Sequence, residues 1–195
     1  MQRFVITFIL LCAFTVSAQR KQNWPESLQD AERVVYKSVG NVKLHMHIFR
    51  PTKQTTSAPS IVFFFGGGWK GGTPKQFEQQ CSYLASRGMV AVTAEYRIRN
   101  LHGTQATDCV DDGKSAVRWI RANAKKLGVD PNRIAAGGGS AGGHVAACAS
   151  VIKGLEAKGE DRKISSVPNA MVLFNPPCVL APVPERKDFL NPENI

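Results

Sequence analysis

The sequence has few of the residues that most often bind metal ions. Its 195 residues include 5 cysteines and 4 histidines. No two cysteines lie at the spacing of metal ligands, which excludes the common zinc sites built from paired cysteines. We find no motif that requires a metal, a nucleotide or a flavin. No cofactor is therefore expected.

The sequence also lacks an apolar run long enough to cross a bilayer. The longest, Phe4 to Val16, follows Arg3 and precedes the small residues Ser17 and Ala18. A short basic region, a short apolar region and small residues before Gln19 are typical of a secretory signal peptide. We predict a leader over residues 1–18, a secreted or periplasmic protein, and no membrane span after cleavage. A buried N-terminal helix or a membrane anchor is the alternative interpretation.

Four cysteines follow the predicted leader: Cys81, Cys109, Cys148 and Cys178. In an exported chain they could pair in three ways. Cys81 and Cys148 fall in apolar helical patterns, where a free cysteine packs as a small hydrophobic residue. This favours packing thiols and leaves disulfide pairing open.

A concentrated basic surface is missing, although the formal net charge is +10. The basic residues are scattered, and their densest run, Arg118 to Lys126, is interpreted as the exposed face of a helix. No basic stripe is interleaved with aromatic residues, so a nucleic-acid partner is not expected. The sequence has neither an internal repeat nor a low-complexity segment, and its length suits a single domain. We predict one domain over residues 19–195.

Strand patterns alternate with helix patterns along this domain. Continuous apolar or β-branched runs predict buried strands, and apolar residues at helical spacing predict the helices between them. Such an alternation indicates an α/β fold with a doubly wound, mostly parallel sheet. The strands are expected at Ala31–Val39, Val42–Phe49, Ile61–Phe65, Met89–Ala94, Arg133–Ala136 and Ala170–Phe174, and the helices at Thr73–Gly88, Asp108–Leu127 and Ala141–Lys153.

The last predicted strand has no element after it to cover it. From Asn175 onward the sequence has five prolines and no periodic pattern. A strand left at a bare sheet edge is prone to aggregation, and natural proteins avoid such edges. We therefore expect this domain to be incomplete at its C-terminus.

Ser140 is the centre of the sequence Gly138-Gly139-Ser140-Ala141-Gly142. A short strand pattern precedes it and a helix pattern of small residues follows. A serine on such a turn projects its hydroxyl above the sheet edge, and the glycines allow strand and helix to approach closely. Some seventy residues earlier, Gly66-Gly67-Gly68 follows a buried strand. Backbone N–H groups of such a loop can stabilise the oxyanion formed when a serine attacks an ester.

Further segments accompany these two motifs: Phe63-Phe64-Phe65-Gly66-Gly67-Gly68-Trp69, Glu95-Tyr96-Arg97, Asp111 through Trp119, and Asp130-Pro131-Asn132-Arg133-Ile134 with the segment Gly138 to His144. With them the sequence resembles the α/β-hydrolase superfamily, specifically secreted carboxylesterases and acetyl-xylan-type esterases related to hormone-sensitive lipase. The resemblance covers Val42 to Pro176. It implies that Ser140 is the nucleophile and that the backbone N–H groups of Gly67, Gly68 and Ala141 bind the oxyanion.

The chain departs from this family downstream of Ser140. In the superfamily the nucleophile is followed by an acid and then by a histidine. The only later histidine is His144, one helical turn on, which the resemblance makes a packing or capping residue. Phe65 stands where the family often has histidine. We therefore expect the acid and the base of the triad to lie beyond Ile195.

The remaining polar candidates are interpreted as structural. His45 and His47 share one face of a strand; they could bind a metal, but we expect exposed surface. His102 is expected in a loop, and Glu95 and Arg97 are expected to form an ion pair. By resemblance, Asp112 supports the elbow region. Carboxylates of the charged loop and the tail, among them Glu156 and Glu160, carry no signature of a catalytic acid.

We predict a serine esterase that hydrolyses small carboxylic esters, with acetyl groups on carbohydrate as the expected target. Ser140 attacks, and the three backbone amides hold the oxyanion. Two alternatives stay open: a non-catalytic binding protein on a degenerate hydrolase scaffold, and a serine peptidase of the same superfamily. The glycine-rich loop with Trp69 favours the esterase over the peptidase.

Overall fold

The computed structural model describes residues 24–25, 27–53 and 56–178. Six strands form one twisted sheet in the order β1-β2-β4-β3-β5-β6. They are β1 (Glu32–Val39), β2 (Val42–Phe49), β3 (Ala58–Phe64), β4 (Val90–Ala94), β5 (Val129–Gly139) and β6 (Ala170–Phe174). The predicted leader lies outside the described residues.

The sheet is mixed, with a parallel half that carries the candidate site. β1 pairs with β2, and β2 with β4, in antiparallel fashion. β3 pairs with β4 and with β5, and β5 with β6, all parallel. The parallel strands β3 and β4 are buried along almost their whole length, because helices cover both faces of the sheet. The prediction of an α/β fold with a mostly parallel sheet is confirmed.

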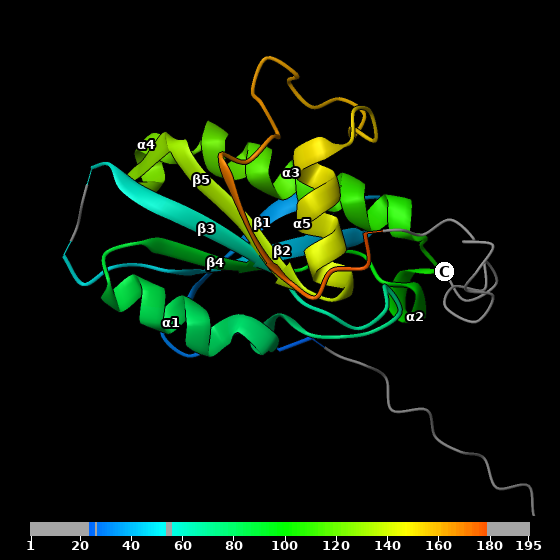
Figure 1. Ribbon diagram of the computed structural model, residues 1–195, viewed down its shortest axis with the longest axis horizontal. Coiled ribbons are helices and arrows are strands. Elements are labelled where there is room, and N and C mark those ends of the chain that lie inside the picture. The colour runs from blue at the N-terminus through cyan, green and yellow to red at the C-terminus, as the bar shows by residue number, and fades with distance from the viewer. Residues whose placement is uncertain (1–23, 26, 54–55, 179–195) are drawn as a thin grey trace, which may run out of the picture.

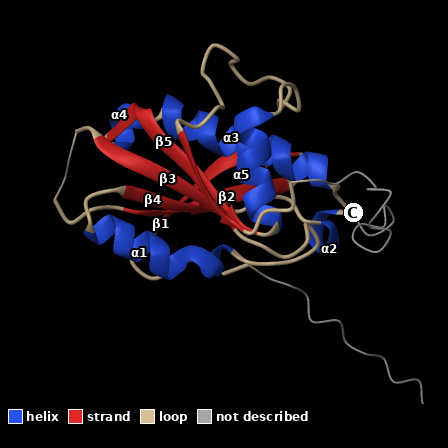
Figure 2. Ribbon diagram, viewed as in Figure 1, coloured by secondary structure: helices blue, strands red, loops and turns tan. Residues whose placement is uncertain are grey.

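Helices lie on both faces of this sheet, as Figures 1 and 2 show. One face packs against α3 (Ala106–Ala122) and α5 (Ala141–Val151) and forms the larger apolar core, which includes Phe64, Val92 and Val145. The other face packs against the 3-10 helix η1 (Pro74–Phe77) and α1 (Glu78–Ser86) through Phe63, Phe77 and Cys81. Two short helices, α2 (Arg99–His102) and α4 (Ala124–Leu127), complete the described elements.

Several predicted boundaries are wrong for local reasons. The helix expected at Asp108–Leu127 is two helices, α3 and α4, separated at Asn123. The helix expected from Thr73 begins as a 3-10 turn, with the Thr73 side chain accepting a hydrogen bond from Lys75 N. β5 is longer than the predicted Arg133–Ala136, because Val129 already pairs with Ala58 before the register shifts across the Asp-Pro-Asn segment. Val42–Phe49 and Ala170–Phe174 are confirmed.

Arg118 also corrects a prediction, since it was expected on an exposed helix face. Its side chain is 7% exposed and forms ion pairs with Glu156 and Glu160 of the loop that follows α5. Lys114, one turn earlier, is 2% exposed and bonds Glu156 Oε1 at 2.8 Å. These contacts fasten the loop onto α3. The charges of the two elements therefore neutralise one another inside the fold.

Candidate active site

Ser140 lies on the sharp turn between β5 and α5. Its backbone has φ 50° and ψ −119°, a conformation that residues with a side chain rarely adopt. The turn is held at both ends: Ser140 N donates to Phe174 O at 2.9 Å, and His144 N donates to Ser140 O at 3.0 Å. Such strain is tolerated only where the surrounding structure enforces it, and it is common at functional sites. The predicted strand–turn–helix setting of Ser140 is confirmed.

The glycines of this turn are required by close backbone packing. A Cβ placed on Gly142 would lie 2.0 Å from Phe64 O, and one on Gly138 would lie 2.5 Å from the Gly142 carbonyl. A Cβ on Gly66 would lie 2.9 Å from Gly139 O and 3.4 Å from Ser140 Cβ. The glycine-rich loop after β3 therefore lies directly against the turn that carries Ser140.

The loop Gly66-Gly67-Gly68 exposes backbone donors next to Ser140. Gly67 has φ 139° and Gly68 has φ 61°, both favoured by glycine. The loop closes on itself, with Lys70 N and Gly71 N donating to Gly67 O. Within residues 24–25, 27–53 and 56–178, the N–H groups of Gly67, Gly68 and Ala141 have no hydrogen-bond partner. None of the three predicted oxyanion donors is therefore already paired within that part of the chain.

A cavity of about 460 Å³ opens beside Ser140. Gly67 and Ser140 line it, whereas Gly68 and Ala141 do not. Phe77 and Phe174 form an apolar wall, with ring centroids 6.0 Å apart. The polar lining side chains are Gln76, Gln80 and Asn175, so the lining carries no charge. The cavity suits a small neutral ligand.

A larger cavity of about 710 Å³ lies at the opposite end of the sheet. Arg50, Lys125 and Val90, the first residue of β4, are among the residues that line it. Ligands of open α/β sheets bind beyond the carboxyl ends of the parallel strands, which is where Ser140 lies. Position in the fold therefore favours the smaller cavity as the active site.

His144 packs behind the turn and is unsuited to act as a base for Ser140. It is 6% exposed, and burial lowers the pKa of its imidazole. Trp69 Nε1 donates to His144 Nδ1 at 3.3 Å, and His144 Nε2 lies 3.3 Å from Cys148 Sγ. Since an indole N–H can only donate, Nδ1 is the acceptor and Nε2 carries the proton toward sulfur. Both ring nitrogens are occupied, which agrees with the predicted packing role.

His47 was expected on the surface, and that expectation is wrong. Its side chain is fully buried, and Nε2 lies 3.6 Å from Glu95 Oε1. His45 is partly exposed, and its Nδ1 lies 2.9 Å from Glu95 Oε2 and 3.0 Å from Arg33 Nη2. Among the described residues, no group of three or more His, Cys, Asp or Glu side chains is arranged to hold a metal ion. His102 lies in α2, where its Nδ1 bonds Ile98 N at 3.0 Å.

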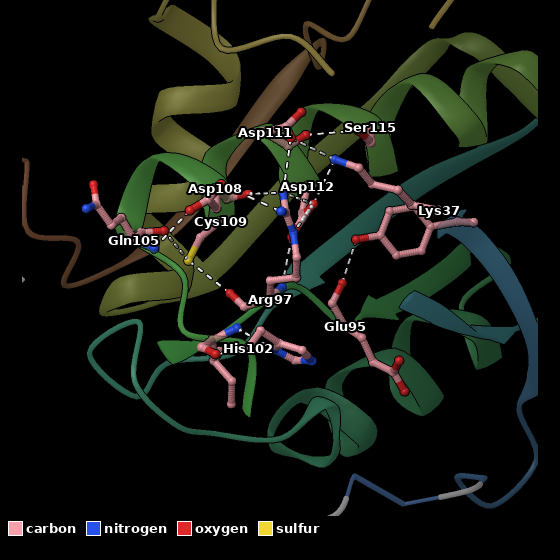
Figure 3. A network of polar contacts seen from close by, with 12 residues as sticks. Lys37, Glu95, Arg97, His102, Gln105, Asp108, Cys109, Asp111, Asp112 and Ser115 are labelled. Carbon is pink, nitrogen blue, oxygen red and sulfur yellow. Dashed lines mark hydrogen bonds and ion pairs between the residues drawn. The ribbon is translucent and has the colours of Figure 1, made fainter. Parts of the chain in front are cut away.

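The predicted ion pair between Glu95 and Arg97 is also wrong, because the two side chains bond to different elements. Arg97 Nε lies 2.8 Å from Asp112 Oδ2, and the buried Asp112 carboxylate also pairs with Lys37 at 2.7 Å. Asp111 pairs with both cations as well. Figure 3 shows how this network joins β1, the segment after β4 and the start of α3. Asp112 is structural, as predicted, but its bonds run to Arg97 and Lys37.

Four free cysteines lie within the described residues. Cys81 and Cys109 are fully buried, and burial raises the pKa of both thiols. Cys148 is half-buried beside His144, and Cys178 is exposed. The prediction that Cys81 packs as a thiol is confirmed.

Comparison with known proteins agrees with this geometry. The profile of a family named BD-FAE matches residues 46–178, more than half of the chain. The chain belongs to the BD-FAE family. The match includes the glycine-rich loop, the segment after β4 and the whole Ser140 turn. The predicted resemblance to α/β-hydrolase carboxylesterases related to hormone-sensitive lipase is confirmed.

This BD-FAE chain is similar to proteins described as esterases. It is 29% identical over 150 residues to carboxylesterase NlhH of Mycobacterium tuberculosis, covering 74% of this chain and 46% of that protein. It is 38% identical over 103 residues to esterase LipC of the same organism, covering 52% of this chain and 25% of the relative. The chain thus spans about half the length, or less, of the curated relatives named here.

Solved structures of Thermogutta terrifontis esterase 2 share the fold. The structure described as phosphorylated by paraoxon has a TM-score of 0.76 and 52% identity, covering 78% of this chain and 59% of that one. The structure described as phosphoramylated by tabun has a TM-score of 0.79 and 49% identity, covering 85% and 64%. The α/β-hydrolase fold of this BD-FAE member is therefore shared with an esterase.

Proposed function

We propose that this protein is a serine hydrolase of small carboxylic esters, with Ser140 as the nucleophile. One observation carries the proposal: Ser140 lies on a strained strand-to-helix turn, in a neutral cavity, directly against a glycine loop in which the Gly67 and Gly68 N–H groups have no hydrogen-bond partner among the described residues. A nucleophile next to unpaired backbone donors is the arrangement that acyl transfer requires. Membership of the BD-FAE family and likeness to esterases support it.

The proposed reaction proceeds through an acyl-serine intermediate. Ser140 Oγ attacks the ester carbonyl carbon while a base accepts the hydroxyl proton, and the carbonyl oxygen becomes an oxyanion. The N–H groups of Gly67, Gly68 and Ala141 donate to that oxygen. The bond to the alcohol oxygen then breaks, and the alcohol leaves with the proton from the base. Water attacks the acyl-serine, releasing the carboxylic acid and restoring Ser140.

The base and the acid of the triad lie outside the 195 residues in this proposal. His144 is occupied on both ring nitrogens. The chain covers 46% of NlhH and 59% of the paraoxon-treated esterase 2 structure, which is consistent with a longer gene product. Reading the coding DNA past Ile195 tests this point. A reading frame that continues through a further Asp or Glu and then a His is expected, whereas a stop codon there contradicts the proposal for the native product.

The cavity favours ester substrates with a short acyl group and a neutral alcohol. It is small, one wall is formed by Phe77 and Phe174, and its polar side chains are uncharged amides. Esterase 2 of Thermogutta terrifontis has been solved with propionate and with butyrate bound. Aromatic rings and amides are also suited to contact sugar rings and their hydroxyls. We propose acetyl groups on carbohydrate as the target, and a secreted or periplasmic location directed by residues 1–18.

Covalent labelling tests the nucleophile. The product of the complete reading frame is treated with paraoxon or a fluorophosphonate, the modified peptide is mapped, and turnover of p-nitrophenyl acetate is measured. We expect one label, on Ser140, and loss of turnover by about 10³-fold to 10⁶-fold in Ser140→Ala. Ser150→Ala is the matched control, since Ser150 lies on the same helix and bonds Ala146 O.

The outcomes separate the alternatives. A label that persists in Ser140→Ala overturns the assignment of the nucleophile. A folded protein with neither label nor turnover supports the binding scaffold. Hydrolysis of peptide amides in preference to esters supports the peptidase.

A further inference from the structure

One peptide bond of the glycine-rich loop is held from both sides. Tyr96 Oη donates to Phe65 O at 2.6 Å, and Gly66 N donates to Gln76 Oε1 at 2.5 Å. The Phe65 carbonyl and the Gly66 N–H are the two polar groups of a single planar peptide unit. Two side chains from different parts of the fold therefore fix the orientation of that plane.

Tyr96 is rigidly placed for this bond. It is fully buried and stacks on the Phe65 ring, with centroids 4.3 Å apart and planes 20° from parallel. Burial raises the pKa of its phenol, as does the nearby Cys109, so the hydroxyl stays protonated and donates. The next residue, Arg97, is bound to α3, because Arg97 N donates to Asp112 Oδ2 at 2.9 Å. The buried network of Figure 3 thus anchors the segment that carries Tyr96.

Gln76 is anchored separately, through the start of η1. Thr93 Oγ1, on β4, donates to Pro74 O at 2.9 Å, and Gln76 N donates to Thr73 O at 3.1 Å. These bonds place the 3-10 turn over the end of β4. Both side chains that hold the Phe65–Gly66 peptide are therefore placed by β4. Gln76 is placed through the bond from Thr93 to Pro74, and Tyr96 lies two residues after the strand ends.

The held peptide comes immediately before the oxyanion donors. The next N–H along the chain is that of Gly67, and glycine backbones adopt many conformations unless something restricts them. We propose that Tyr96 and Gln76 are positioning residues that aim the Gly67 and Gly68 N–H groups at the developing oxyanion. The proposal rests on the esterase function proposed above. Tyr96 acts through Phe65 and, being fully buried, does not touch substrate.

Paired substitutions test the role of Tyr96 in the product of the complete reading frame. Tyr96→Phe removes one hydroxyl and is expected to lower kcat about 10-fold to 100-fold, below the 10²-fold to 10³-fold loss of a whole oxyanion donor. KM should stay within about twofold, because the substrate ground state does not use the oxyanion contacts. Tyr83→Phe is the matched control, since Tyr83 is an exposed tyrosine on α1. That variant should keep its kcat.

Gln76→Met tests the bond that Gly66 N donates to the Gln76 side chain. Gln79→Met, at an exposed position nearby, is its control. Loss of the acceptor should lower kcat as in Tyr96→Phe, and because Gln76 also lines the cavity, the expectation of an unchanged KM applies to Tyr96→Phe alone. The double variant should lose less than the product of the two single effects, because both act on one peptide plane. Equal losses in Tyr96→Phe and Tyr83→Phe, or a change in Tyr96→Phe that is confined to KM, would overturn the proposal.

A readout independent of turnover keeps this inference distinct from the esterase function. Amide hydrogen exchange of Gly66, Gly67 and Gly68 is followed by NMR in wild-type protein and in Tyr96→Phe. Faster exchange of the Gly66 amide in the variant supports the held peptide even if wild-type protein hydrolyses no ester. Unchanged exchange at Gly66 overturns it even if the protein is an active esterase.

Discussion

At Gly142 the space that a side chain would need is filled by backbone atoms at the end of β3 and of the residue that follows it. A Cβ there would meet Phe64 O at 2.0 Å and Phe65 O at 2.4 Å. Phe64 is the last residue of β3, and Phe65 leads into the glycine loop. At residue scale, α5 can therefore pack this closely against β3 only because residue 142 is a glycine.

Gly142→Ala should destabilise the protein despite the better helix propensity of alanine. Overpacking of this kind costs about 1–3 kcal/mol in the free energy of unfolding, against a gain of up to about 1 kcal/mol from propensity. Urea denaturation measures the difference. Gly139→Ala is the control, because a Cβ there would meet Phe77 Cζ at an ordinary 3.6 Å. Equal stability of the two variants would contradict the packing argument.

At element scale, the loop between α5 and β6 is fastened to α3 by charge. Glu156 bonds Lys114 and Arg118, and Ser166 Oγ donates to Glu156 Oε1 at 3.3 Å. Burial alone would raise the pKa of Glu156, but the hydrogen bonds and charges of Lys114 and Arg118 outweigh burial and hold it below its ordinary value. The loop leads into β6, whose Phe174 carbonyl bonds Ser140 N.

The lowered pKa of Glu156 predicts how the stability of the fold changes as the pH falls. A carboxyl whose pKa is lower in the folded state stabilises the fold above its unfolded pKa, about 4.3 for Glu. That contribution is lost as the pH falls through the folded value. Glu156→Gln should therefore be less stable at pH 7, by about 1–3 kcal/mol, and should lose less stability below pH 4. Urea denaturation from pH 7 to pH 3 measures both, and parallel curves would contradict the prediction.

At the scale of the whole molecule, β6 forms an apolar edge. Within the described part of the chain it pairs only with β5, and Met171, Val172 and Phe174 are 45%, 38% and 46% exposed. No helix among those same residues is long and apolar enough to cross a membrane. Unpaired backbone groups beside apolar side chains favour pairing with another strand.

The 195-residue chain by itself should therefore self-associate. Val172→Lys places a charge on the edge and should weaken association about tenfold or more, equivalent to at least about 1.4 kcal/mol. Sedimentation velocity across a concentration series measures this. Tyr83→Lys, at an exposed position on α1, is the control and should change association little. A wild-type chain that stays monomeric throughout would contradict the prediction.

Sequence reasoning succeeded where the signal was local. Continuous apolar runs predicted β3 and β4, and alternating apolar and polar residues predicted β2. Burial of a strand on both faces of a sheet requires the first pattern, and burial on one face requires the second. It failed where a polar residue is buried by a partner distant in the sequence. His47 faces Glu95, and Arg118 faces Glu156 and Glu160, and nothing near either residue predicts these partners.

The sequence by itself determined the order of strands and helices, the turn that carries Ser140 and the glycines around it. These follow from hydrophobic periodicity and from conformations that only glycine adopts easily. Tertiary structure alone decided that Arg97 bonds Asp112, that His144 is occupied by Trp69 and Cys148, and that Tyr96 and Gln76 hold one peptide plane. The physical reason is that hydrogen bonds and ion pairs depend on distances across the fold, which spacing along the chain does not encode.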